Sequence, residues 1–160
     1  MEKYACIDGD YRYILGRKWD AKKPQVTFVM LNPSTADAQQ DDRTLNRCIK
    51  FAQSWDYGSL EVVNLFAYRA TKRDVLCNVS DPIGLKNDNY IKLAIKNTNL
   101  IIVAWGTGKY PKIQNRNKEV LSLIYSSQQP LYCLGTTIDG NPRHPVRIAT
   151  NTQRIIFRNI

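Results

Sequence analysis

The sequence predicts an α/β fold, a three-layer α/β/α sandwich with a central sheet of four parallel strands. Four apolar runs have the length of buried strands, at residues 26–31, 61–63, 100–104 and 131–134. The gaps between them have room for crossovers that contain a helix, and right-handed crossovers place helices on both faces of a parallel sheet. A polar cluster follows each run. Because ligands bind beyond the carboxyl ends of parallel strands, we expect these clusters to share one crevice.

The length of the chain predicts a single domain. With 160 residues and 43% hydrophobic content, the chain is large enough for one core and too short for two ordinary domains. We expect one domain over residues 1–160, with an N-terminal hairpin extension at 1–24 and a core at 26–147. No apolar run reaches about 18 residues, and the N-terminus lacks the apolar segment of a secretion signal. We therefore expect a cytoplasmic monomer that does not enter membranes.

The segments around the first central strand predict a hairpin and a helix. Residues 4–7 and 11–15 flank the turn Asp8-Gly9-Asp10, which predicts two paired strands with 11–15 at the edge of the sheet. A helix is predicted from Asp42 to Ser54, because four apolar residues recur on one helical face: Leu45, Cys48, Ile49 and Ala52. The pair Asp41-Asp42 is interpreted as the N-terminal cap of this helix rather than as a cation site.

Two further helices are predicted in the second half of the chain. They span about 85–97 and 113–126, and the second directs Val120, Leu121 and Ile124 inward. Residues 67–83 have no clear period and predict a long connection, a kind of segment that often carries function. Residues 154–158 are apolar enough for a final strand or a docked helical turn.

Several classes of site are not supported by the sequence. The four cysteines are widely spaced without a CxxC pair, so we interpret them as structural thiols rather than as zinc or iron–sulfur ligands. One histidine and the absence of a carboxylate cluster argue against a dedicated catalytic metal site. No GxxxxGK[ST], GxGxxG or GxSxG motif occurs. We therefore expect no cofactor.

The charge of the chain points to nucleic acid. A net charge of +9 and an isoelectric point near 9.5 favour polyanions through counterion release. Much of the excess follows the ends of the predicted strands, at Arg69, Lys72, Arg73, Lys109, Lys112, Arg143 and Arg147. A second group is interpreted as a solvated face, at Arg12, Arg17, Lys18, Lys22 and Lys23. We expect DNA, duplex or single-stranded, as the partner.

The polar clusters carry a resemblance to a known superfamily. In chain order they are Asn32-Pro33-Ser34, Asn64-Leu65-Phe66, Trp105-Gly106 and a segment from Gly135 to His144-Pro145. Their order and spacing over residues 26–147 resemble the motifs of the uracil-DNA glycosylase superfamily, which implies a uracil-DNA-glycosylase-like sandwich. The signature Leu-Asn-Pro-Ser-Thr-Ala, with the later Asn-Leu-Phe-Ala-Tyr-Arg-Ala-Thr, also resembles a family of small bacterial and phage proteins.

The resemblance implies a monofunctional DNA glycosylase, which flips a base out of DNA and hydrolyses its bond to the sugar. His144 would donate a hydrogen bond to the departing base anion, Asn32 would hold the attacking water, and Asn64 would recognise the base edge. The resemblance places the other base-binding residues at Pro33, Ser34 and Phe66. It places DNA contacts at Arg69, Lys109, Arg143, Pro145, Val146 and Arg147, with Val146 as a wedge in the base stack.

Departures from the superfamily pattern bear on the substrate. Ser34-Thr35-Ala36 stands where the uracil-specific branch has a bulky tyrosine, which predicts a modified pyrimidine such as 5-hydroxymethylated or glucosylated cytosine of phage DNA. Asn32 replaces the aspartate of the fastest branch, which predicts slower chemistry. Repair and phage defence both fit this activity. Two alternatives remain: a nucleic-acid-binding module without catalysis, and a hydrolase or transferase of free nucleosides or nucleotides.

Overall fold

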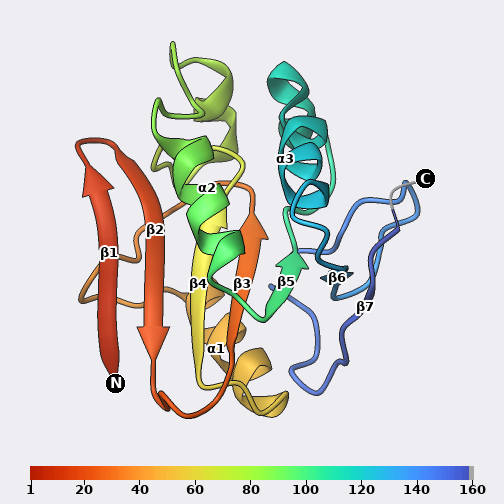
Figure 1. Cartoon of the computed structure of the whole chain (residues 1–160). Coiled ribbons are helices and arrows are strands. Elements are labelled where there is room, and N and C mark those ends of the chain that lie inside the picture. Colours follow the sequence, from red (N-terminus) through yellow and green to blue (C-terminus); the bar gives the residue numbers. More distant parts are fainter. Residues whose placement is uncertain (159–160) are drawn as a thin grey trace.

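A seven-stranded mixed sheet forms the centre of the fold (Figure 1). The computed structural model describes residues 1–158. The spatial order of the strands is β1-β2-β4-β3-β5-β6-β7. Their bounds are β1 Glu2–Asp8, β2 Tyr11–Lys18, β3 Gln25–Met30, β4 Ser59–Asn64, β5 Leu100–Val103, β6 Leu131–Cys133 and β7 Ile155–Ile156.

The four apolar runs form neighbouring parallel strands, in the order β4-β3-β5-β6. The chain passes from β3 to β4 on one side and then crosses to β5 on the other side of β3. The carboxyl ends of β3 and β5 therefore flank the point where the strand order reverses, which is where open α/β sheets bind ligands. The sheet is wider than the four strands that the sequence predicts, because β1, β2 and β7 add to it in antiparallel pairing.

Helices cover both faces of the sheet, which explains why the central strands are apolar on both sides (Figure 1). Helix α1 (Arg43–Ser54) packs on one face, and α2 (Asn87–Lys96) and α3 (Arg116–Tyr125) pack on the other. The residues that the sequence places on the inner faces of α1 and α3 are buried. Two short 3₁₀ helices, η1 (Arg73–Cys77) and η2 (Tyr110–Asn115), lie in the connections after β4 and β5.

The third helix begins later than the sequence pattern predicts. Gln114 and Asn115, the last two residues of η2, have positive φ angles of 53° and 59°, so the chain leaves helical geometry just before α3. Asparagine tolerates this left-handed conformation better than most residues. The α-helix therefore begins at Arg116 and not at residue 113.

The N-terminal hairpin is present, but its second strand is not at the edge. Strand β2 lies between β1 and β4, so the edge prediction for residues 11–15 is wrong. The solvated-face interpretation is also wrong for Arg12 and Arg17, whose residues are only 4% and 0% exposed. The reason is that loop 34–41 folds against β2 and accepts hydrogen bonds from both guanidinium groups.

Three arginines hold loop 34–41, the segment that follows Asn32-Pro33. Arg17 also pairs with the Asp41 carboxylate at 2.9 Å. The guanidinium groups of Arg12, Arg17 and Arg69 donate to backbone carbonyls of Ser34, Thr35, Ala36, Asp37 and Gln40. Hydrogen bonds from charged donors are among the stronger ones in proteins. The loop beside the first polar cluster is therefore tied to β2 and to the chain after β4.

The four cysteines are free thiols. Cys48 and Cys133 are buried, and Cys77 is exposed on η1. Within residues 1–158, no helix has both the length and the apolar character needed to cross a membrane.

The predicted cap of α1 is formed by Asp42. Its Oδ1 accepts the Leu45 N–H at 2.8 Å, and its Oδ2 accepts the Ala36 N–H at 3.3 Å. We expect Asp42→Ala to lower the free energy of unfolding by about 1–2 kcal/mol, because the helix loses its capping acceptor. Asp42→Asn keeps an acceptor oxygen and is expected to lower it less. Urea unfolding of the three proteins measures the difference, and equal losses in both variants would show that the capping bond is not the source.

Candidate functional site

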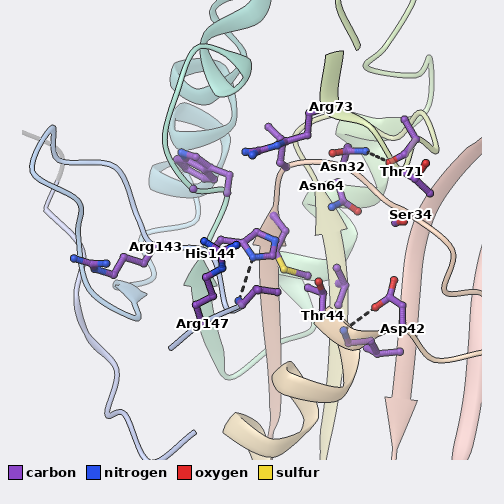
Figure 2. Close-up of a pocket in the computed structure, with 18 of the residues that line it drawn as sticks. Asn32, Ser34, Asp42, Thr44, Asn64, Thr71, Arg73, Arg143, His144 and Arg147 are labelled. Atoms are coloured by element: carbon purple, nitrogen blue, oxygen red, sulfur yellow. Dashed lines mark hydrogen bonds between the residues drawn. The ribbon is translucent and has the colours of Figure 1, made fainter. Parts of the chain in front are cut away.

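A cavity of about 610 Å³ opens at the carboxyl ends of β3, β4 and β5 (Figure 2). Its wall includes residues from all four polar clusters, so the strand ends do share one crevice. Of the predicted catalytic, base-binding and DNA-binding residues, seven line it: Asn32, Ser34, Asn64, Arg143, His144, Val146 and Arg147.

Phe66 and Pro33 are not among the residues that line the cavity. Phe66 has no exposed surface and packs in the core on the α2 and α3 side, so its base-binding prediction is wrong. The backbone at Leu65 and Phe66 still pairs with the chain at the end of β3, but the alternation of side chains between the two faces ends here, because Leu65 and Phe66 both pack on the α2 and α3 side. Pro33 is buried, and its carbonyl accepts the Ala70 N–H at 2.9 Å, so it serves the turn.

Three of the predicted DNA contacts also lie outside the wall. Arg69 uses its guanidinium within the protein, on the carbonyls of Ser34 and Thr35. Pro145 is buried, and its carbonyl accepts the Arg47 Nε–H at 3.0 Å. Lys109 is exposed, with its Nζ 5.5 Å from the centre of the Tyr110 ring. Of these three residues, only Lys109 keeps a free surface position.

The orientation of the Asn32 amide is defined by its partners. Nδ2 donates to the Ala70 carbonyl at 2.8 Å and to the Pro33 carbonyl at 3.0 Å. Two carbonyl acceptors require the nitrogen at this position, so the opposite atom is the oxygen. Oδ1 of Asn32 therefore remains as an acceptor at the cavity wall (Figure 2).

Asn64, the last residue of β4, presents a buried amide to the cavity. The residue is 1% exposed, and neither Oδ1 nor Nδ2 has a hydrogen-bond partner among residues 1–158. Buried amide groups in proteins nearly always have partners, because an unpaired one loses its hydration without compensation. A ligand with an acceptor next to a donor would satisfy both atoms.

His144 lies at the end of a braced loop. The Arg143 N–H donates to the Gly135 carbonyl at 2.9 Å, and the Gly106 N–H donates to the Pro142 carbonyl at 2.9 Å. Gly106 has a φ of +81°, and a Cβ there would lie 3.5 Å from the His144 Cβ. The positive φ of the turn after β5 favours glycine, whereas a Cβ at this distance would only make an ordinary contact with the histidine.

The tautomer of His144 follows from its own hydrogen bond. Its Nδ1 accepts the Val146 N–H at 3.2 Å, so in the neutral ring the proton is on Nε2. Burial and the positive charge of Arg73 lower the pKa of His144 to about 4, and Asp42 partly opposes the shift. At neutral pH the cavity therefore contains an uncharged imidazole that can donate through Nε2.

The charges around the cavity are mainly positive. Arg73, Arg143 and Arg147 are exposed at its wall, and burial lowers the pKa of Arg12 to about 10 without discharging it at neutral pH. Asp42 is the carboxylate among the described lining residues, and both its oxygens accept backbone N–H groups. Within residues 1–158, no three histidine, cysteine or acidic side chains gather closely enough to hold a metal ion.

Several lining residues were not among the sequence-derived candidates, namely Arg12, Asp42, Thr44, Thr71, Arg73 and Trp105. Trp105 and Arg73 could have been chosen, because one lies inside a polar cluster and the other in the basic group after β4. Arg12 had no such signal, since only the long-range pairing of β2 brings it to the cavity.

A family model described as "Protein of unknown function (DUF1643)" matches residues 12–146 of this chain. No curated protein and no solved structure gives a significant match.

The pKa of His144 is directly measurable, because the chain has one histidine. We expect the imidazole proton signals in NMR spectra to titrate with a midpoint near pH 4. Arg73→Gln should raise the midpoint by removing a nearby positive charge. Lys72→Gln is the matched control, and should change it less. A midpoint near the ordinary value of 6.5 in the folded protein would contradict this description of the site.

The same shift makes folding depend on pH. Between about pH 4 and 6.5, the unfolded chain binds a proton at His144 that the folded chain excludes. The free energy of unfolding should therefore rise with pH across this window. His144→Gln removes this contribution, so urea midpoints at pH 4.5 and pH 7 should differ less in the variant than in the wild type. An unchanged difference would refute the linkage.

Proposed function

The chain belongs to this family of proteins of unknown function, and we propose that it is a DNA glycosylase that removes a modified or damaged base and leaves an abasic site. The observation that carries the proposal is the unpaired Asn64 amide, buried in the same cavity as the uncharged His144 and the acceptor oxygen of Asn32. These three groups supply recognition of a base edge, a donor for a base oxygen and an acceptor for water (Figure 2).

The reaction breaks the bond between a base nitrogen and the sugar C1′. Water supplies a hydroxyl group to C1′, and its remaining proton ends on the base. As the bond breaks, negative charge collects on the base, and a hydrogen bond to its carbonyl oxygen stabilises the transition state. His144 suits this role because its low pKa keeps it neutral and its Nδ1 bond directs the proton to Nε2.

Asn32 is suited to hold the water rather than to deprotonate it. Its Nδ2 is committed to two backbone carbonyls, so Oδ1 accepts from a water that faces C1′. An amide oxygen is a poor base at neutral pH, and a general base typically contributes about 10²–10⁴-fold. We therefore propose a slow enzyme that depends on anion stabilisation and positioning.

The size and lining of the cavity support a modified pyrimidine as the substrate. Besides Asn64, the wall carries the small polar side chains of Ser34 and Thr44 (Figure 2). A volume of about 610 Å³ falls in the range of sites for drug-sized ligands and leaves room beyond one base. We propose a 5-substituted cytosine, such as a hydroxymethylated or glucosylated one, in a setting of DNA repair or phage defence.

The positive rim supports DNA as the partner. Arg73, Arg143 and Arg147 lie around the opening and are exposed, so they are free to contact phosphates. The parallel order β4-β3-β5-β6, with helices on both faces, also supports the uracil-DNA-glycosylase-like sandwich that we propose for the core. We propose that a monomer acts on DNA without a cofactor.

The test is an excision assay on duplex and single-stranded oligonucleotides that carry uracil, hypoxanthine, alkylated bases or 5-substituted cytosines. Alkali treatment then reveals abasic sites as strand breaks. We expect excision of a 5-substituted cytosine. His144→Ala and Asn32→Ala should each lower the rate about 10²-fold or more. Leu93→Ala, at an exposed position of α2, is the control and should keep full activity.

The negative outcomes separate the alternatives. Salt-sensitive DNA binding without excision of any base would indicate a nucleic-acid-binding module without catalysis. Turnover of a mononucleotide without DNA would indicate a nucleotide hydrolase or transferase. Excision that persists in His144→Ala would refute the anion-stabilising role.

A further inference from the structure

The three tryptophans of the chain differ in the partners of their indole N–H groups. Trp19 Nε1 donates to the Tyr57 carbonyl at 3.0 Å, and Trp55 Nε1 donates to the Thr152 carbonyl at 3.2 Å. Trp105 is 2% exposed, and its Nε1 has no hydrogen-bond partner in the part of the chain that the structure describes. Buried indole N–H groups usually have a hydrogen-bond acceptor. Trp105 therefore lacks the acceptor that Trp19 and Trp55 each have.

Trp105 belongs to the cavity wall. It is the second residue after β5 and its ring meets Phe157 edge-on, at 6.4 Å between centroids and 75° between planes. The next residue is Gly106, the position that approaches His144. The unpaired groups of Asn64 and Trp105 therefore come from the two strands that flank β3.

Other groups at the cavity wall are also donors. Figure 2 shows Arg73, Arg143 and His144 on one side of the cavity, and Ser34 and Asp42 on the other. An indole N–H can only donate, as can a guanidinium group and the Nε2–H of His144. With these donors and the Trp105 N–H in its wall, the cavity is complementary to a ligand group that is rich in acceptor oxygens.

We propose that Trp105 is a substrate-binding residue, whose Nε1–H donates to an oxygen acceptor of the bound nucleotide. The acceptor is a base carbonyl or a phosphate oxygen, since both offer the same chemistry to an N–H donor. The inference rests on the proposed function, because the ligand is the nucleotide of that site. It adds a recognition element to Asn32, Asn64 and His144, the groups on which the proposed function depends.

The matched pair for the test is Trp105→Phe and Trp55→Phe. Each keeps a large aromatic ring and removes one indole N–H, which is unpaired in the first case and bonded to the Thr152 carbonyl in the second. In the protein without ligand, we expect Trp105→Phe to leave the urea midpoint unchanged or raise it. Trp55→Phe should lower it, because a carbonyl loses its partner.

Ligand binding is measured separately from excision, with two probes. One is a duplex with a single tetrahydrofuran abasic-site analogue, which presents phosphates without a base. The other is free 5-hydroxymethylcytosine or uracil, which presents a base without phosphates. We expect Trp105→Phe to weaken binding of one probe about 5–10-fold, as for the loss of one hydrogen bond, with Trp55→Phe unchanged. The affected probe identifies the acceptor.

The outcomes of this experiment distinguish the two proposals. If the wild type binds a probe and Trp105→Phe binds both probes equally well, the inference is overturned, whatever the excision assay gives. If Trp105→Phe lowers the urea midpoint and leaves binding unchanged, the Trp105 N–H stabilises the folded protein and does not bind the ligand. That result would also overturn the inference. If the wild type excises no base and binds neither probe, the proposed function fails and the inference fails with it.

Discussion

The parallel pairing of β3 with both β4 and β5 is the constraint on which the rest of the structure depends. It brings Asn32, Asn64 and Trp105 to one edge of the sheet although they are far apart in the chain. It also buries both faces of the central strands under helices, and so determines where α1, α2 and α3 pack. The cavity is a consequence of this topology, because the chain leaves β3 in one direction and returns to its other side.

The basic character of the protein has two separate physical uses. Arg12, Arg17 and Arg69 donate to the carbonyls of loop 34–41, where their charge strengthens hydrogen bonds that shape the cavity wall. Other cations remain exposed around the opening, where they are available to a polyanion. Net charge alone does not separate these uses, because it counts a buried structural arginine and a free surface arginine equally.

The cavity keeps polar groups that the fold leaves unpaired. Asn64 and Trp105 are buried without partners among residues 1–158, and His144 is held in its neutral form. Such groups reduce stability, because they lose hydration without a compensating hydrogen bond. Unpaired polar groups in a cavity at the strand ends are typical of a binding site, because a bound ligand can form the hydrogen bonds that the protein alone lacks.

The sequence by itself determined the central strands, the three helices and the polar clusters at one edge. Apolar periodicity and the Asp42 capping signal are local, so they can be read from neighbouring residues. The tertiary structure decided which polar residues reach the cavity and which are used in the fold. Arg12 and Trp105 line the cavity, while Phe66 lies in the core. The physical reason is that burial depends on segments distant in the chain, such as loop 34–41 over β2, whose contacts leave no periodic signal in the sequence.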